Sequence, residues 1–147
     1  MSVSSARFER TAAHPVPADD FEGVLLRAPE RFVAGQPCVV RGAFQIGPDA
    51  LATLPREDAY DALTLLVTER ASARSTTVRP ARSAVALATE PGPAGRRRGW
   101  FELDVIGMSG FRPRAGTITV SAWLGPLRSE GHDVIVEAPP ETTGGHR

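Results

Sequence analysis

The clearest alternation of hydrophobic and polar positions lies near the C-terminal end of the chain. Residues 117–124 follow the two-residue period of a strand that buries one face. The apolar positions on the core face are Ile118, Val120, Ala122 and Leu124. Trp123 falls on the opposite, outward face. A Gly-Pro pair ends this run, a polar turn follows over residues 128–133, and a β-branched segment at residues 134–136 stops before two prolines. The pattern predicts two antiparallel strands that close an all-β domain.

The same period predicts further strands upstream. Residues 38–46 would place Cys38, Val40, Gly42, Phe44 and Ile46 on a core face. Residues 100–106 would direct Phe101, Leu103 and Val105 inward and Trp100, Glu102 and Asp104 outward. Shorter strands are expected at residues 21–28, 63–69, 76–79 and 85–87. The spacing predicts a single antiparallel β-sandwich of seven or eight strands with long loops.

The segments between these strands are rich in turn formers. Residues 29–35 read as a turn, and residues 90–99 as a loop of Pro, Gly and Arg. Residues 47–62 read as a long connection with a short helical turn over residues 49–54. We divide the chain into an N-terminal arm at residues 1–20 that is flexible or packed on a partner, a sandwich domain at residues 21–138, and a disordered tail at residues 139–147.

Composition narrows the classes of partner. The 17 basic residues are all arginine and balance 17 acidic ones, so the net charge is zero. A neutral chain has no basic footprint for nucleic acid or for a membrane surface. We expect no secretory leader, because the first twenty residues carry no apolar run, and no run reaches transmembrane length. The single Cys38 suits a reducing compartment. We therefore expect a cytoplasmic protein with no nucleic-acid and no membrane partner.

Candidate catalytic and metal-binding residues are sparse, and no cofactor or metal is expected. His14 and His146 lie in expected tails, and no His or Cys has a neighbour at a familiar metal spacing. Cys38 reads more simply as a small buried apolar side chain than as a copper ligand with His132 and Met108. Glu102 and Asp104 share a strand face, where they would form an acid–base pair or cross-strand ion pairs with Arg41, Arg70 or Arg79.

Two features favour recognition instead. Arg96, Arg97 and Arg98 form a glycine-bounded loop that is a possible anion-binding site, with Trp100 beside it as an aromatic surface. Trp123 points outward and Trp100 would share its outer face, giving two partner-binding anchors unless a loop or the arm covers a ring.

Two segments carry a resemblance to a known class of fold. FRPRAGTITVSAWLGPLRS at residues 111–129 resembles the penultimate strand and turn of immunoglobulin-like and fibronectin-like bacterial sandwiches. AGQPCVVRGAF at residues 34–44 resembles their second strand, and the similar strand order spans residues 21–138. Ile118 stands where such domains often carry a corner tyrosine, and Cys38 has no second cysteine to pair with. The resemblance implies an immunoglobulin-like fold and no particular function.

These observations predict a non-catalytic protein-binding module, such as an assembly or accessory subunit, that acts through an exposed sheet face or edge. A small homo-oligomer is compatible with this prediction. The alternative is a sandwich that binds a small ligand or catalyses a reaction in a polar or anion-binding pocket. A closed pocket that joined Cys38, Glu102, Asp104 and the arginine loop would favour that alternative.

Overall fold

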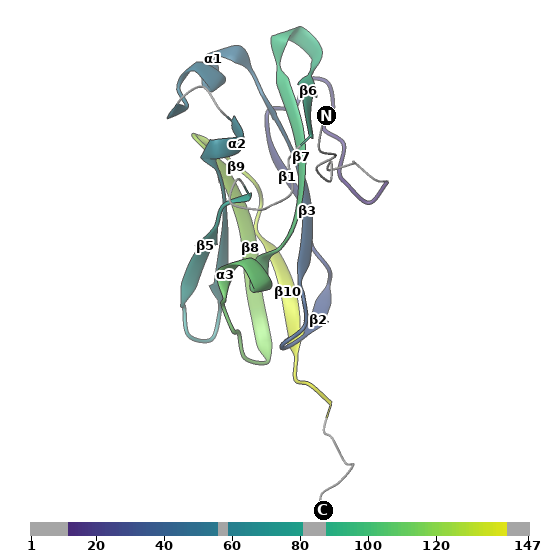
Figure 1. The fold of residues 1–147 in the computed structure, drawn as a ribbon, viewed down its shortest axis with the longest axis vertical. Helices are drawn as coiled ribbons and strands as arrows, with labels where there is room; N and C mark the ends of the chain where they lie inside the picture. Colours follow the sequence, from purple (N-terminus) through teal and green to yellow (C-terminus); the bar gives the residue numbers. More distant parts are fainter. Residues whose placement is uncertain (1–11, 56–58, 81–87, 141–147) are drawn as a thin grey trace, which may run out of the picture.

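The computed structural model describes residues 12–55, 59–80 and 88–140, which form two β-sheets packed face to face (Figure 1). The first sheet has four antiparallel strands in the order β1-β3-β7-β6. Its strands are β1 (Gly23–Arg27), β3 (Val39–Ile46), β7 (Arg97–Asp104) and β6 (Ala88–Pro91). In Figure 1 this sheet lies on the right.

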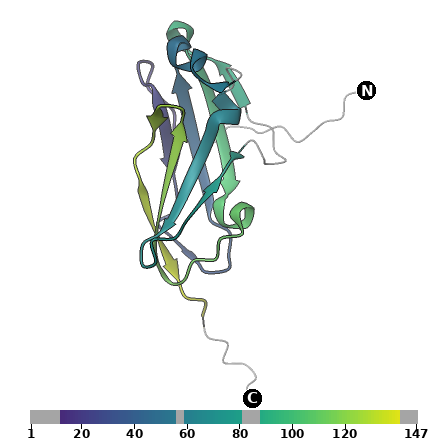
Figure 2. The ribbon, with the colours of Figure 1, turned by 90° about the vertical axis from the view of Figure 1, so that its left-hand side faces the viewer.

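The second sheet has the order β2-β10-β8-β4-β5, and in Figure 1 it runs from β2 at the lower right to β5 at the left. Its strands are β2 (Arg31–Val33), β10 (His132–Glu137), β8 (Gly116–Leu124), β4 (Leu63–Glu69) and β5 (Ser75–Val78). A short strand, β9 (Leu127–Arg128), pairs with β8. Only the β2–β10 pair is parallel among the pairs in the described residues. In the view of Figure 2, turned by 90°, the long strands of both sheets run roughly along the vertical axis. The all-β prediction is confirmed.

Short helices connect the strands. They are α1 (Pro48–Ala52), α2 (Ala59–Ala62), α3 (Val105–Ser109) and the 3-10 turn η3 (Pro93–Gly95). Pro48 begins α1, where a missing backbone N–H costs nothing. Asp104 caps α3 by accepting a hydrogen bond from the Ile106 N–H, and Gly110 ends it in the left-handed region at φ 69°.

The core fills the space between the two inner faces. In β4 every second residue is buried, and the same alternation runs through β8. The core-face residues expected from the sequence within residues 38–46 and 117–124 are all buried. Phe101 and Leu103 of β7 also point inward, as expected.

Two glycines in adjacent strands are required by aromatic rings. Gly42 pairs with Phe101, and Gly99 pairs with Phe44, across the β3–β7 register. A Cβ atom on Gly42 would lie 2.1 Å from the Phe101 ring, and one on Gly99 would lie 2.4 Å from the Phe44 ring. Each ring therefore covers the backbone of the opposite glycine. This packing keeps both glycines within the paired strands, although glycine has a low intrinsic β-propensity.

Several local predictions were wrong. Residues 29–35 were expected to be a turn but contain β2, which is held by parallel pairing to β10. Residues 90–99 were expected to be a loop, yet β6 extends into them and β7 begins at Arg97. Residues 105–106 continue the apolar alternation but begin α3. The expected strand at residues 85–87 lies outside the described residues.

No helix in the described part of the chain is long and apolar enough to cross a lipid bilayer.

Candidate interaction surfaces

The outer face of the four-stranded sheet is covered by the chain's own N-terminal segment. We call residues 12–20 the arm, and the surface beneath it the arm face. In Figure 1 the arm is the purple segment on the right, on the side of this sheet that faces away from β8. His14 is 2% exposed, Pro15 and Pro17 are also buried, and Val16 between them is 60% exposed. His14, which the sequence placed in an arm that is flexible or packed on a partner, lies on the sheet of its own chain.

The arm face consists of three successive rows of side chains set by the strand register. The first row contains Arg27, Arg41 and Glu102, the second Leu25, Ala43 and Trp100, and the third Gly23, Gln45 and Arg98. Each row holds a successive part of the arm. In the first row, Arg27 Nη1 donates to the Ala13 carbonyl at 3.2 Å, and His14 Nε2 lies 3.6 Å from Glu102 Oε1.

The second row binds the arm through an indole. Trp100 Nε1 donates to the Pro15 carbonyl at 3.2 Å, and the ring is 2% exposed. Its neighbour across the ladder, Ala43, is small and fully buried, which leaves room for the chain above. The indole thus satisfies its polar N–H while its ring is buried under the arm.

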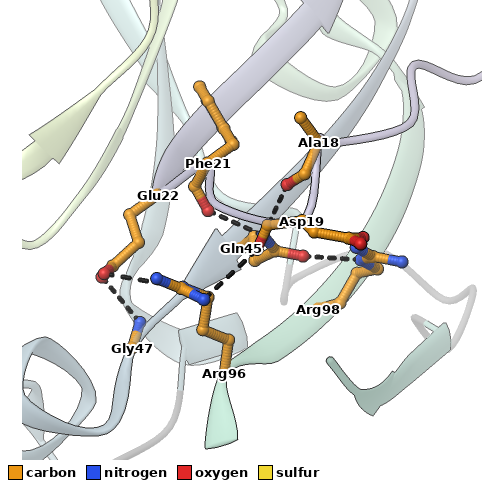
Figure 3. A network of polar contacts seen from close by, with 8 residues as sticks. All are labelled: Ala18, Asp19, Phe21, Glu22, Gln45, Gly47, Arg96 and Arg98. Atoms are coloured by element: carbon orange, nitrogen blue, oxygen red, sulfur yellow. Dashed lines mark hydrogen bonds and ion pairs between the residues drawn. The ribbon is translucent and has the colours of Figure 1, made fainter. Parts of the chain in front are cut away.

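The third row is centred on Gln45, whose side chain is fully buried (Figure 3). Its amide nitrogen lies 2.9, 3.2 and 2.7 Å from the carbonyl oxygens of Ala18, Asp19 and Phe21. Its amide oxygen accepts a hydrogen bond from Arg98 Nε at 2.7 Å. One side chain therefore ties the turn that ends the arm to the arginine on the neighbouring strand.

Two of the three predicted anion-binding arginines, Arg96 and Arg98, contact the same arm residue, Asp19. Arg98 Nη2 contacts the Pro17 carbonyl at 3.4 Å. It also lies 3.7 Å from the Asp19 carboxylate (Figure 3). Arg96 donates to the Asp19 carbonyl at 3.2 Å and lies 3.6 Å from the Glu22 carboxylate. Arg97 is exposed and forms no ion pair with a described residue. Two of the three guanidinium groups thus bind acceptors of this chain.

The carboxylates with proposed acid–base roles have structural partners. Glu102 Oε1 accepts a hydrogen bond from Arg41 Nε at 2.8 Å, the cross-strand pairing that was one of the two expectations for it. Asp104 Oδ1 accepts hydrogen bonds from the backbone N–H groups of Cys38 at 3.0 Å and Ile106 at 3.1 Å. Neither Arg70 nor Arg79 pairs with them; Arg70 binds Asp133 instead, at 3.0 Å.

Cys38, the residue before β3, is fully buried in the core. Burial, with a smaller contribution from the negative charge of Asp104, raises the pKa of its thiol to about 11. The thiol is therefore protonated at neutral pH and unsuited to act as a nucleophile. The described residues also contain no group of three or more His, Cys, Asp or Glu side chains arranged to hold a metal ion.

The two tryptophans do not share a face. Trp100 lies on the outer side of one sheet, beneath the arm, whereas Trp123 lies on the outer side of the other sheet and is 46% exposed. The expectation of a joint aromatic surface was therefore wrong. For Trp100 the alternative holds, because the arm covers its ring. The outward direction of Trp123 is confirmed.

The surface around Trp123 carries mainly hydroxyl and apolar side chains on β4 and β8, with Arg128 of β9 across the ladder from Trp123. We call the outward side of β4, β8 and β10 the Trp123 face. Besides Trp123 it carries Thr64, Leu66, Thr68, Thr117, Thr119, Ser121, Asp133 and Ile135. Ile135 is 45% exposed and pairs with Thr117, so it lies about 20 Å from Trp123 along the strand. A hollow of about 760 Å³ borders Trp123 and is lined by Ser121, Arg128, Ser129, Glu130 and Gly131.

A buried carboxylate organises the opposite end of the second sheet. Glu69 accepts hydrogen bonds from the Ser72 hydroxyl and, at 2.7 Å, from the Arg114 N–H, and its carboxylate lies 3.5 Å from Arg74. These contacts lower the pKa of Glu69 below its usual value, and the hydrogen bond from Ser72 contributes most. They join the β4–β5 turn to the loop before β8.

Sequence reasoning missed Gln45 and His14 as residues that organise a surface. Gln45 occupies a position that the strand period assigns to the outward face, where an exposed glutamine is unremarkable in sequence terms. The one available signal was the pair of prolines at positions 15 and 17, which favours an extended chain able to lie on a sheet. No protein-family model, curated protein or solved structure matches this chain.

Proposed function

We propose that this chain is an immunoglobulin-like β-sandwich that binds another protein through the Trp123 face. Immunoglobulin domains have strands A, B, E and D in one sheet and C, F and G in the other. The order β1-β3-β7-β6 corresponds to A-B-E-D, and β10-β8-β4 corresponds to G-F-C. The parallel β2–β10 pair, which places the first strands in both sheets, also supports this topology.

The exposed indole of Trp123 is the observation that carries the binding function. Tryptophan is enriched among the residues that dominate binding energy, because it buries a large apolar area. Trp123 pairs with Thr64 on one side and with Arg128 of β9 on the other, so it stands among side chains that offer methyl groups and hydrogen bonds. A span of about 20 Å between Trp123 and Ile135 suits an interface of ordinary size.

The separation of the polar candidates supports binding over catalysis. Arg97 and Asp104 stand at the two ends of β7, about 23 Å apart. The pocket that would have joined the arginine loop to Cys38, Glu102 and Asp104 is therefore not formed by these residues. An accessory or assembly subunit, self-association and a cytoplasmic location remain parts of the proposal.

The test compares native complexes captured by three versions of the full chain from source cells. The wild type and Met108→Ser should retain one stoichiometric protein partner, while Trp123→Ser should lose at least about 90% of it. Met108 is a matched control, because it is an exposed apolar side chain on α3, away from the Trp123 face. All three proteins must melt at similar temperatures.

Equal capture by Trp123→Ser and the wild type would overturn the proposed surface. A small molecule that co-purifies with the chain in place of a protein would favour the ligand-binding alternative. Light scattering of the purified chain separates self-association from binding to a different partner.

A further inference from the structure

The arm is held as a ligand is held, through its backbone. Five carbonyl oxygens, at Ala13, Pro15, Pro17, Ala18 and Asp19, accept hydrogen bonds from side chains of the folded body. The arm joins no strand ladder. A surface that reads carbonyl groups with fixed donors recognises an extended chain rather than one particular side chain.

Proline suits this mode of binding. Pro15 and Pro17 have no N–H group to leave unsatisfied, and their fixed φ favours the extended form before binding. Both rings are buried, and the indole of Trp100 donates to the carbonyl of Pro15. An aromatic N–H that donates to the carbonyl of a proline-containing extended segment is a recognition device with little entropic cost.

Two side-chain contacts flank the carbonyl contacts of the arm. At one end the Asp19 carboxylate meets Arg98, and at the other end His14 meets Glu102. The first row also carries Arg27 and Arg41, so the direction of a bound segment follows from the order of its carbonyl acceptors and buried proline rings rather than from charge.

Only one turn connects the arm to the body. The Phe21 N–H donates to the Ala18 carbonyl at 3.0 Å, which closes a turn over Asp19 and Asp20 before β1 begins. Opening this turn would release the arm without disturbing a strand. Short connections of this kind permit an identical element to be exchanged between copies of a chain.

We propose that the arm face is a binding site for an extended proline-containing segment, and that the arm of a second copy of this chain can occupy it. The second copy is the favoured occupant because its arm supplies every carbonyl acceptor and both side chains, His14 and Asp19, that the face already contacts. Exchange preserves these contacts and changes only the turn. The tethered arm competes at a millimolar effective concentration, so the wild type exchanges only at high protein concentration.

Two complementary full-length variants test the proposal. The donor, Gln45→Ala with Arg98→Ala, keeps its arm but loses the third row of the arm face. The acceptor, His14→Gly with Pro15→Gly and Pro17→Gly, keeps the face but loses the buried rings and the preference for an extended chain. Mixing them should give a 1:1 dimer in sedimentation experiments at a concentration where each alone is a monomer.

The matched control replaces the donor with Gln36→Ala, which alters an exposed glutamine outside the arm face. This control retains its own arm, so its association with the acceptor should be at least about tenfold weaker than that of the donor. No dimer from folded donor and acceptor would overturn the proposal.

A second measurement applies if either variant fails to fold. Several millimolar of an unlabelled peptide with the sequence of residues 12–22 should displace the tethered arm of the isotope-labelled wild-type chain, and should therefore shift the backbone N–H resonances of Ala13 and Asp19 in that arm. The same peptide with glycine in place of both prolines should not. Identical spectra with both peptides would mean that the arm is only a covalent cover of its own sheet.

Discussion

Replacing Gln45 with methionine tests the arm face at its most connected residue. Methionine keeps the length of the side chain but removes the amide that contacts three carbonyl oxygens and Arg98. Two neutral N–H bonds contribute about 1 kcal/mol each, and a bond from a charged guanidinium contributes about 1.5–3 kcal/mol. Because the carbonyl groups regain some water at the edge of the arm, we expect a loss of about 3 kcal/mol in the free energy of unfolding.

For a domain of this size, 1 kcal/mol corresponds to about 4 °C in melting temperature, so Gln45→Met should melt about 12 °C lower than the wild type. Differential scanning calorimetry measures this shift directly. Gln36→Met is the control, because Gln36 is exposed and its side chain is not part of the arm face. It should melt within about 2 °C of the wild type. A shift below about 3 °C for Gln45→Met would refute the view that this side chain holds the arm.

Three further predictions concern other parts of the fold. Gly99→Ala should lower the free energy of unfolding in urea titrations by more than about 3 kcal/mol, because the new Cβ would collide with the Phe44 ring. Gly35→Ala should lower it by only about 1 kcal/mol, because its Cβ would enter open space and only the positive φ opposes the change. Equal losses for the two variants would contradict the packing described. The Cys38 thiol should react with an aromatic disulfide at pH 8 only as fast as the chain unfolds, and rapid labelling of the native protein would contradict its burial and raised pKa. Because the folded-state pKa of Glu69 is lowered, its stabilising effect is present above about pH 4.5 and is lost as the pH falls further, so the difference in melting temperature between wild type and Glu69→Gln should shrink from pH 7 to pH 3.5; a constant difference would contradict this linkage.

Local alternation was sufficient to predict the central strands. β4 and β8 alternate strictly, and their observed bounds are close to those expected. β2 has three residues and is stabilised by β10, which lies about a hundred positions later in the chain, so no local pattern marks it. β7 begins inside a segment rich in arginine and glycine because the Phe44 ring covers Gly99, a contact between distant residues. At Val105 the alternation continues, but the Asp104 side chain caps a helix instead.

For the candidate surfaces too, the sequence predicted what depends on the local period and missed what depends on distant contacts. The outward direction of Trp123 followed from the period of β8 alone. The burial of Trp100 did not, because it depends on nine residues of arm that the sequence leaves without regular structure. The outward face of the second sheet is therefore open, whereas that of the four-stranded sheet is covered by the arm. This difference depends on contacts of His14, Gln45 and Trp100 with residues that lie far from them in the sequence.

Hydroxyl-radical footprinting of the native complex, compared with the free chain, tests the proposed function most directly. Trp123 and Ile135 should each lose most of their labelling when the partner is bound, while Met108 and Val16, which are exposed elsewhere, should keep theirs. Unchanged labelling of Trp123 in a complex that protects Met108 or Val16 would contradict binding through the Trp123 face.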